Sequence, residues 1–246
     1  MFMSLLSAER MKLKNMYVWL IFLASPILTG VIGFSPSAIS APNQWMVIST
    51  QMILAHSALF LPLLTGIFAA LVCYFEHSDG GWKQLLALPV QRIDVFVAKY
   101  TIVMILLLLA QLFFGAAIFV VGTIQGIKDP FLWNSILFSC FMGWLSCFPL
   151  AALQFWLSAH FTSFAGPTAI NVILSLPAIL IANSELLGPL YPWAHPLLSM
   201  TQAFSVSLGG DAGFLANESG YYSVLIGSFL LFIIAGGIYF QRKQWT

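Results

Sequence analysis

The stretch AKYTIVMILLLLAQLFFGAAIFVV, residues 98–121, decides the fold class of this chain, because Lys99 is its only charged residue. A helix needs about 20 mainly apolar residues to cross the hydrocarbon core of a bilayer, and this stretch is long enough to do so. In lipid, a helix satisfies its own backbone hydrogen bonds. The stretch therefore predicts an all-α integral membrane protein.

The composition of the whole chain agrees with this prediction. Of its 246 residues, 60% are hydrophobic and only 7% are charged, and the mean hydropathy is +0.95. A soluble domain usually carries about 25% charged residues, so this chain in water would expose large apolar patches. Cys73, Cys140 and Cys147 lie in apolar segments without metal-ligand spacing, and we expect them to be packing residues rather than part of a metal site.

The same length criterion predicts six spans in a single membrane domain that covers residues 1–246. The spans are residues 16–34, 48–74, 98–121, 132–157, 168–187 and 221–240. The second and fourth are long enough to tilt, or to kink at Pro62 and Pro149. Between spans five and six, residues 188–220 are interrupted by Pro189, Pro192 and Pro196. Prolines break helices, so we expect re-entrant half-helices there.

The distribution of lysine and arginine predicts the orientation. In a six-span layout only Lys128 falls on one side, and eight basic residues fall on the other: Arg10, Lys12, Lys14, Lys83, Arg92, Lys99, Arg242 and Lys243. Basic residues concentrate on the cytoplasmic side of membrane proteins. Both termini are therefore expected in the cytoplasm.

No short catalytic motif is present in the sequence. It contains no phosphate-binding loop, no H-E-x-x-H metal pair and no G-x-S-x-G elbow, and His56, His77, His160 and His195 are scattered among different segments. We expect no catalytic residues in this chain. An intramembrane enzyme remains an alternative, because an active site can be assembled from distant residues.

The stretch EHSDGGWKQLLALPVQR, residues 76–92, interrupts the apolar chain with charges, glycines and a proline. Gly80 and Gly81 allow a sharp turn. Beyond them, Trp82, Leu85 and Leu86 have the spacing of one helix face, while Lys83 and Gln84 point away and Pro89 ends the helix. The pattern predicts a short amphipathic helix at the cytoplasmic surface between spans two and three. An ordinary interfacial loop is the alternative interpretation.

The order of features in this stretch resembles the loop between the second and third spans of type-2 ABC exporter permeases. It is particularly similar to the small permeases of lantibiotic-immunity and bacitracin-resistance transporters. The opening SAERMKLKNMYVWLIFLASPIL, residues 7–28, also resembles the E-x-x-K-L-K start of that family. The six-span layout with both ends inside agrees as well.

The resemblance implies a subunit in the bacterial cytoplasmic membrane that exports or expels an antimicrobial peptide. ATP and Mg²⁺ would be bound by a separate cytoplasmic ATPase subunit, expected in two copies, and this chain would hold no cofactor. A second permease subunit, identical or related, is expected, and no nucleic-acid partner. The short helix would couple the ATPase to the spans through Glu76, Gly81, Trp82, Lys83, Leu85, Leu86, Pro89 and Arg92. Glu76 is expected to pair with a base such as Arg92 or with the partner.

Five polar residues inside the spans are candidates for a substrate pathway: Gln51, His56, Gln111, Gln154 and Asn171. Such groups normally face a protein interior or a cavity. They predict either hydrogen bonds between helices or a polar cavity for the peptide. At the level of the whole chain, a membrane anchor or sensor that recruits a cytoplasmic partner without transport remains the alternative function.

Overall fold

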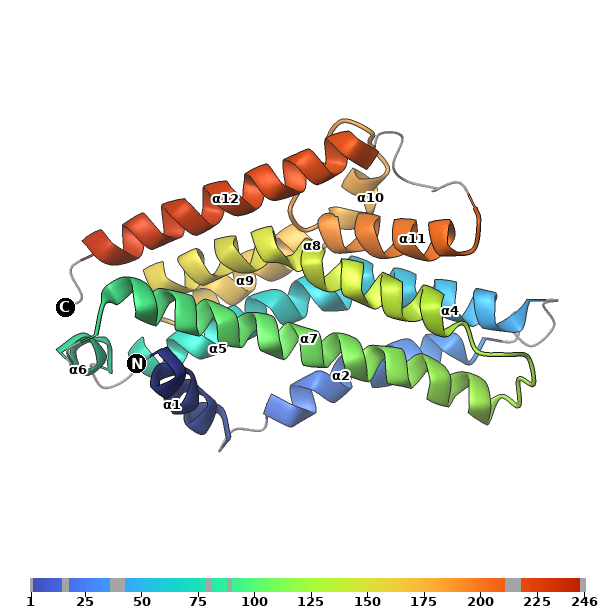
Figure 1. Cartoon of the computed structure of the whole chain (residues 1–246), viewed down its shortest axis with the longest axis horizontal. Helices are drawn as coiled ribbons and strands as arrows, with labels where there is room; N and C mark the ends of the chain where they lie inside the picture. Colours follow the sequence, from blue (N-terminus) through green and yellow to red (C-terminus); the bar gives the residue numbers. More distant parts are fainter. Residues whose placement is uncertain are drawn as a thin grey trace.

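The structure is a computed structural model, and it describes residues 2–14, 18–35, 43–77, 81–87, 90–210 and 218–243. Every regular element within these ranges is a helix, which confirms the all-α part of the predicted fold class. Most of the helices lie side by side along the long axis of the molecule (Figure 1).

Among the described residues, four helical stretches are long and apolar enough to cross a membrane. They are the continuous run of α4 (Gln44–Ala55), η1 (His56–Phe60) and α5 (Leu61–His77), then α7 (Arg92–Ile124), α8 (Trp133–His160) and α12 (Glu218–Arg242). They coincide with the second, third, fourth and sixth predicted spans and extend a few residues beyond each.

The first and fifth predicted spans correspond to shorter helices. These are α2 (Val18–Gly33) in the first span, and α9 (Ala165–Ser175) followed by α10 (Ala178–Ala182) in the fifth. The break between α9 and α10 falls at Leu176 and Pro177, because proline has no N–H to continue the helical ladder. Six crossings therefore remain a prediction.

The second span contains a π-helical turn, η1, immediately before the predicted kink residue Pro62. Pro62 lacks the N–H that a regular helix would use, and π-helical turns are one of the ways in which a helix absorbs such an interruption. These turns occur frequently at functional sites. The run from Gln44 to His77 nevertheless stays helical throughout.

The Trp45 ring of α4 packs directly on the backbone of Gly122, near the end of α7. A Cβ atom at Gly122 would lie 2.2 Å from the Trp45 ring, so only glycine fits there. Trp45 also donates a hydrogen bond of 2.8 Å from its Nε1 to the Asp129 carbonyl. Just after α7, Gly126 has a φ of 77°, the left-handed conformation that glycine commonly supplies at a helix end.

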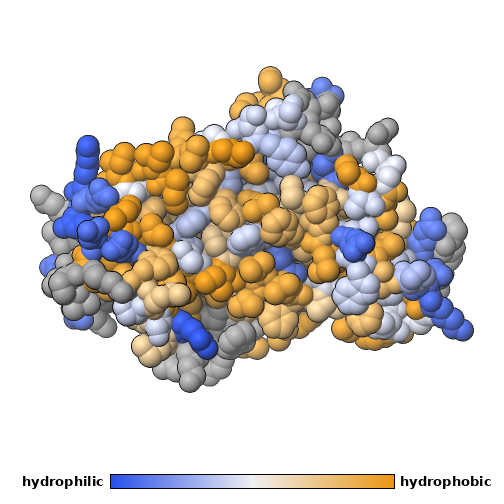
Figure 2. Space-filling view, viewed as in Figure 1, coloured by the Kyte–Doolittle hydropathy of each residue, from blue (hydrophilic) through white to orange (hydrophobic). Residues whose placement is uncertain are grey.

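Helix α8 occupies the middle of the bundle and packs against α5, α7, α11 and α12. The N-terminal helix α1 (Phe2–Lys14), the short helix α6 (Gly81–Ala87) and the last turn of α12 all lie at the same end of the molecule (Figure 1). Figure 2 shows hydrophobic side chains over much of the middle of one face. Hydrophilic side chains gather toward the two ends of the molecule.

The segment between α10 and α12 contains a buried short helix, α11 (His195–Ser207), with Pro196 in its first turn. It packs against α8 and α4, and the Tyr221 hydroxyl of α12 lies 2.6 Å from Ser199 Oγ and donates to the His195 carbonyl at 3.1 Å. A short helix after a proline agrees with the predicted half-helix. Its depth in a membrane remains a prediction.

Candidate functional site

The short helix α6 is present where the sequence predicts it and is seven residues long. A Cβ atom at Gly81 would lie 3.0 Å from both the Cα and a carboxylate oxygen of Glu76, so glycine allows α6 to start directly against α5. Lys83 and Gln84 are exposed and Leu85 is half-buried. The Leu86 side chain and Pro89 lie outside the described residues.

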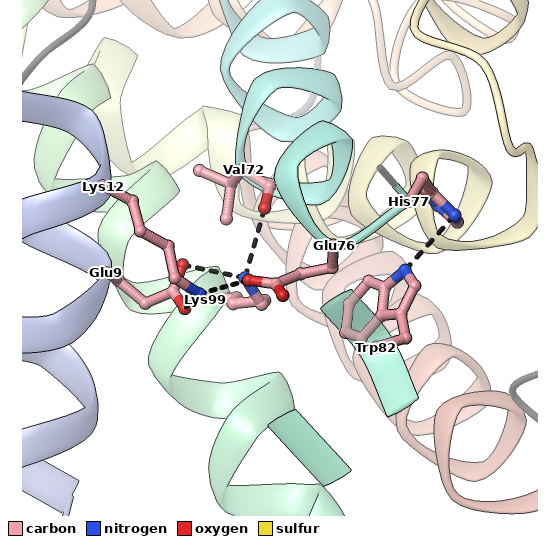
Figure 3. Close-up of polar contacts among 7 residues, drawn as sticks. All are labelled: Glu9, Lys12, Val72, Glu76, His77, Trp82 and Lys99. Carbon is pink, nitrogen blue, oxygen red and sulfur yellow. Dashed lines mark hydrogen bonds and ion pairs between the residues drawn. The ribbon is translucent and has the colours of Figure 1, made fainter. Parts of the chain in front are cut away.

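Trp82 does not project outward as a docking residue; it is buried within the chain, with 5% of its surface exposed. Its Nε1 donates to His77 Nδ1 at 3.3 Å (Figure 3), and its ring packs edge-on against Phe240 with 5.3 Å between the centroids. The Lys99 ammonium lies 5.4 Å from the Trp82 ring centroid. The indole therefore attaches α6 to α5, α7 and α12.

Four charged side chains form a buried cluster beside this tryptophan: Glu9 and Lys12 of α1, Glu76 of α5 and Lys99 of α7 (Figure 3). We call this group the charge cluster. The Lys99 side chain has no exposed surface, and its Nζ donates to Glu9 at 2.8 Å, to Glu76 at 2.9 Å and to the Val72 carbonyl at 3.2 Å.

Lys12 closes the charge cluster from the outer side. It pairs with Glu9 at 2.9 Å and also with Glu76, and 31% of its side chain is exposed. Burial alone would lower the pKa of Lys12, but the hydrogen bonds and charges of Glu76 and Glu9 outweigh it and raise the pKa. Two acids and two bases thus balance their charges at the meeting point of three helices, which is the arrangement that buried ions require.

Glu76 pairs with bases, as expected, but these are Lys12 and Lys99 rather than Arg92. Arg92 instead donates to the carbonyls of Gln241 and Lys243, at 2.7 and 3.2 Å. These contacts tie the start of α7 to the last turn of α12. Arg92 and the charge cluster therefore both help to hold the helix ends together around α6.

Two of the predicted substrate-pathway residues belong to one hydrogen-bond network, in which both polar atoms of Asn171 are used and Gln154 Oε1 has no partner among the described residues. Asn171 Oδ1 accepts from Gln154 Nε2 at 3.0 Å and from Trp193 Nε1 at 2.8 Å. Asn171 Nδ2 donates to the carbonyls of Pro62 and Leu63, at 3.0 and 3.3 Å. For this pair the geometry matches hydrogen bonding between helices.

His56 and Gln111 lie in a second buried region. The His56 ring stacks on Phe114 with 3.8 Å between centroids, and its Nδ1 lies 2.6 Å from Ser25 Oγ. Gln111 donates from Nε2 to Met200 Sδ at 3.6 Å. This region links α2, α4, α7 and α11 near the π-helical turn.

Gln51 alone among the five lines an open cavity, which has a volume of about 490 Å³. None of the described residues that line it is charged, and its walls come from the ends of α2 and α10, from α4 and η1, and from α11. The lining residues are Ile32, Ser35, Gln51, Leu54, Ala55, Ala58, Ile179, Asn183 and Leu197. The five predicted residues are therefore divided between two internal regions and one cavity.

Sequence reasoning missed the charge cluster, although a signal was present. Lys99 lies inside the start of an apolar span, and a charged residue in such a position usually has a partner of opposite charge. With so few acids in the chain, Glu9 and Glu76 were its natural candidates at that end.

The sequence was compared with known proteins. The sequence model of the family described as ABC-2 family transporter protein matches residues 5–178. This range contains the whole charge cluster, α6, the first four predicted spans and part of the fifth. No curated protein matches the chain.

Proposed function

Because the chain belongs to the ABC-2 family of transporter proteins, we propose that it is the permease subunit of an ABC transporter that exports or expels an antimicrobial peptide. A separate cytoplasmic ATPase subunit, in two copies, binds ATP and Mg²⁺ and supplies the energy. Two permease subunits, identical or related, form the pathway. The observation that carries the proposal is the family match over residues 5–178, which includes α6.

In this proposal the six spans are α2, the run from α4 to α5, α7, α8, the pair α9 and α10, and α12. The arrangement of the helix ends supports an even number of crossings, because α1, α6 and the end of α12 share one end of the molecule (Figure 1). Eight of the nine basic residues belong to segments at that end. By the positive-inside rule, this end of the molecule is proposed to face the bacterial cytoplasm.

The proposed ATPase contact is the outer side of α6. Lys83 and Gln84 are exposed there, whereas Trp82 holds the helix from within. A rigidly attached helix can transmit a push from a partner to the spans, and an exposed charge orients the encounter. Closure of the ATPase subunits on ATP would then shift α5 and α7, which flank α6.

The peptide substrate is proposed from the resemblance to lantibiotic-immunity and bacitracin-resistance permeases. The cavity beside Gln51 is compatible with it, because an uncharged and mostly apolar cavity with three polar side chains suits the apolar part of an amphipathic peptide. The cavity lies toward the end of the bundle opposite α6. Transport requires that the peptide bind the two conformations of the pathway unequally.

Co-purification tests this proposal. The tagged chain is extracted from the membrane together with the product of an adjacent ATPase gene, and ATP hydrolysis is measured with and without a lantibiotic. We expect the ATPase to be recovered, a peptide-dependent change in turnover, and greater survival of cells that express the complex. Recovery of the ATPase without any effect of peptide on turnover or survival would instead support a membrane anchor. Failure to recover an ATPase would reject the proposal.

A further inference from the structure

The N-terminal helix α1 is linked to the short helix α6 through the charge cluster, although the first two spans separate these helices in the sequence. We infer that α1 is part of the coupling device, and that Glu9 is a positioning residue which sets the position of α6 through Lys99 and Trp82. The link to an ATPase rests on the proposed function. The link between α1 and α6 rests on the contacts alone.

The contacts form a continuous path from one helix to the other. Glu9 Oε2 of α1 accepts from Lys99 Nζ at 2.8 Å. The same ammonium lies 5.4 Å from the centroid of the Trp82 ring, on α6. A cation near the face of a tryptophan is attracted to it, most strongly where water is excluded. Lys99 therefore contacts both helices with one charged group (Figure 3).

Water cannot easily take the place of Glu9 beside the Lys99 ammonium, because the Lys99 side chain has no exposed surface. If Glu9 loses its charge, Glu76 becomes the only carboxylate shared by the two bases, Lys12 and Lys99. An excess positive charge in a buried site must move toward water or draw in another partner. Either movement displaces the ammonium from the Trp82 ring.

Few other buried side chains hold α1 in place. Among its described residues, only Leu5 and Glu9 are buried, with 9% and 6% of their surfaces exposed. On its outer side, Met3 is 77% exposed and Met11 is 63% exposed. The charge cluster is therefore a principal attachment of α1 to the spans, and a change at Glu9 should loosen α1 and α6 together.

A distance measurement between the two helices tests this inference without an ATPase. Spin labels are attached to Met3→Cys and Lys83→Cys in the full chain in lipid nanodiscs; Cys73, Cys140 and Cys147 are buried. We expect one narrow distance distribution with native Glu9, and loss of the narrow peak in Glu9→Gln. Lys128→Gln, at the exposed opposite end, serves as the control and should keep the peak. An unchanged peak in Glu9→Gln would overturn the inference.

A conservative variant separates the effect of pairing from damage to the fold. Glu9→Asp keeps a carboxylate that can accept from Lys99, so it should largely retain the narrow peak that the uncharged Glu9→Gln abolishes. A folded Glu9→Asp variant that lost the peak as completely as Glu9→Gln would contradict the role of ion pairing. In the complex, Glu9→Gln should also reduce ATPase recovery, and Glu9→Asp should retain it. If the unmodified chain recovers no ATPase, the proposed function fails, while the spin-label result still decides the inference.

Discussion

Glu9 and Lys99 lie 90 positions apart in the sequence, yet their charged groups are 2.8 Å apart in the structure. One residue belongs to the helix that precedes the spans and the other to the buried start of α7. Their contact joins the chain's two most basic segments, the N-terminal lead-in and the region around α6, into one unit. This unit lies at the end where a cytoplasmic partner is proposed to bind.

Removal of the Lys99 charge should strongly destabilise the protein. Lys99→Met leaves Glu9 and Glu76 facing each other with only Lys12 to compensate them. Loss of one partner from a buried ion pair typically costs about 3–5 kcal/mol. Unfolding in mixed micelles, followed by circular dichroism, would measure the loss.

Lys128→Met is the matched control for Lys99→Met, because Lys128 is exposed at the opposite end. It should change the free energy of unfolding by less than about 0.5 kcal/mol, as surface substitutions usually do. Equal effects of the two variants would show that the charge cluster contributes nothing specific to stability.

Trp82→Ala should detach α6 and weaken the ATPase contact indirectly. The substitution removes the ring that packs on Phe240 and lies near Lys99, and truncation of a buried aromatic residue usually costs about 3–5 kcal/mol. We expect both lower stability and poor ATPase recovery, measured on the same preparations. A stable Trp82→Ala variant that binds the ATPase normally would contradict the anchoring role of this side chain.

Lys83→Glu should affect partner binding without affecting stability, because Lys83 is exposed on the outer side of α6. Reversal of a charge at the edge of an interface mainly slows association and changes its salt dependence. We expect roughly tenfold weaker ATPase binding at low salt, with a smaller difference at high salt, where charges are screened. Surface-captured permease and soluble ATPase would provide the rates, and Lys128→Glu is the control for the added charge.

The sequence predicted the parts of this fold that depend on local pattern. Long apolar runs identified the helices of four spans, and the spacing of Trp82 and Leu85 after Gly81 identified α6. Local pattern shows which side chains share a helix face, but not which neighbour that face meets. The sequence therefore assigned Trp82 to the coupling helix without showing its neighbours, which are His77, Lys99 and Phe240.

Local pattern shows that Lys99 needs an acidic partner, but not how the acids are arranged around it. Glu9, Glu76 and Lys99 come from three helices, and the packing of α1 and α5 against α7 brings their charges together. Local pattern is equally insufficient for the polar residues inside the spans. The sequence could not distinguish Asn171, which is satisfied by four hydrogen-bond partners, from Gln51, which lines a cavity.

Asn171→Leu should destabilise the bundle, because the amide joins Gln154, Trp193 and the backbone near Pro62. Hydrogen bonds between membrane helices contribute about 0.6 kcal/mol each on average, so loss of the whole set should cost roughly 2 kcal/mol. Asn134→Leu, on an exposed residue of α8 outside the cavity, is the control. If Asn171→Leu kept full stability and lost only its response to peptide, Asn171 would belong to the substrate pathway instead.

Ala55→Phe should block the cavity beside Gln51. Ala55 is a half-buried lining residue, and a cavity of about 490 Å³ has room for the added ring, so the usual overpacking cost of about 1–3 kcal/mol should be largely avoided. If the cavity receives the apolar part of the peptide, the variant should lose peptide-dependent ATP hydrolysis and still recover the ATPase. Leu230→Phe, on the exposed side of α12, adds a ring outside the cavity and should respond normally to peptide. A normal peptide response in Ala55→Phe would place the peptide elsewhere on the permease.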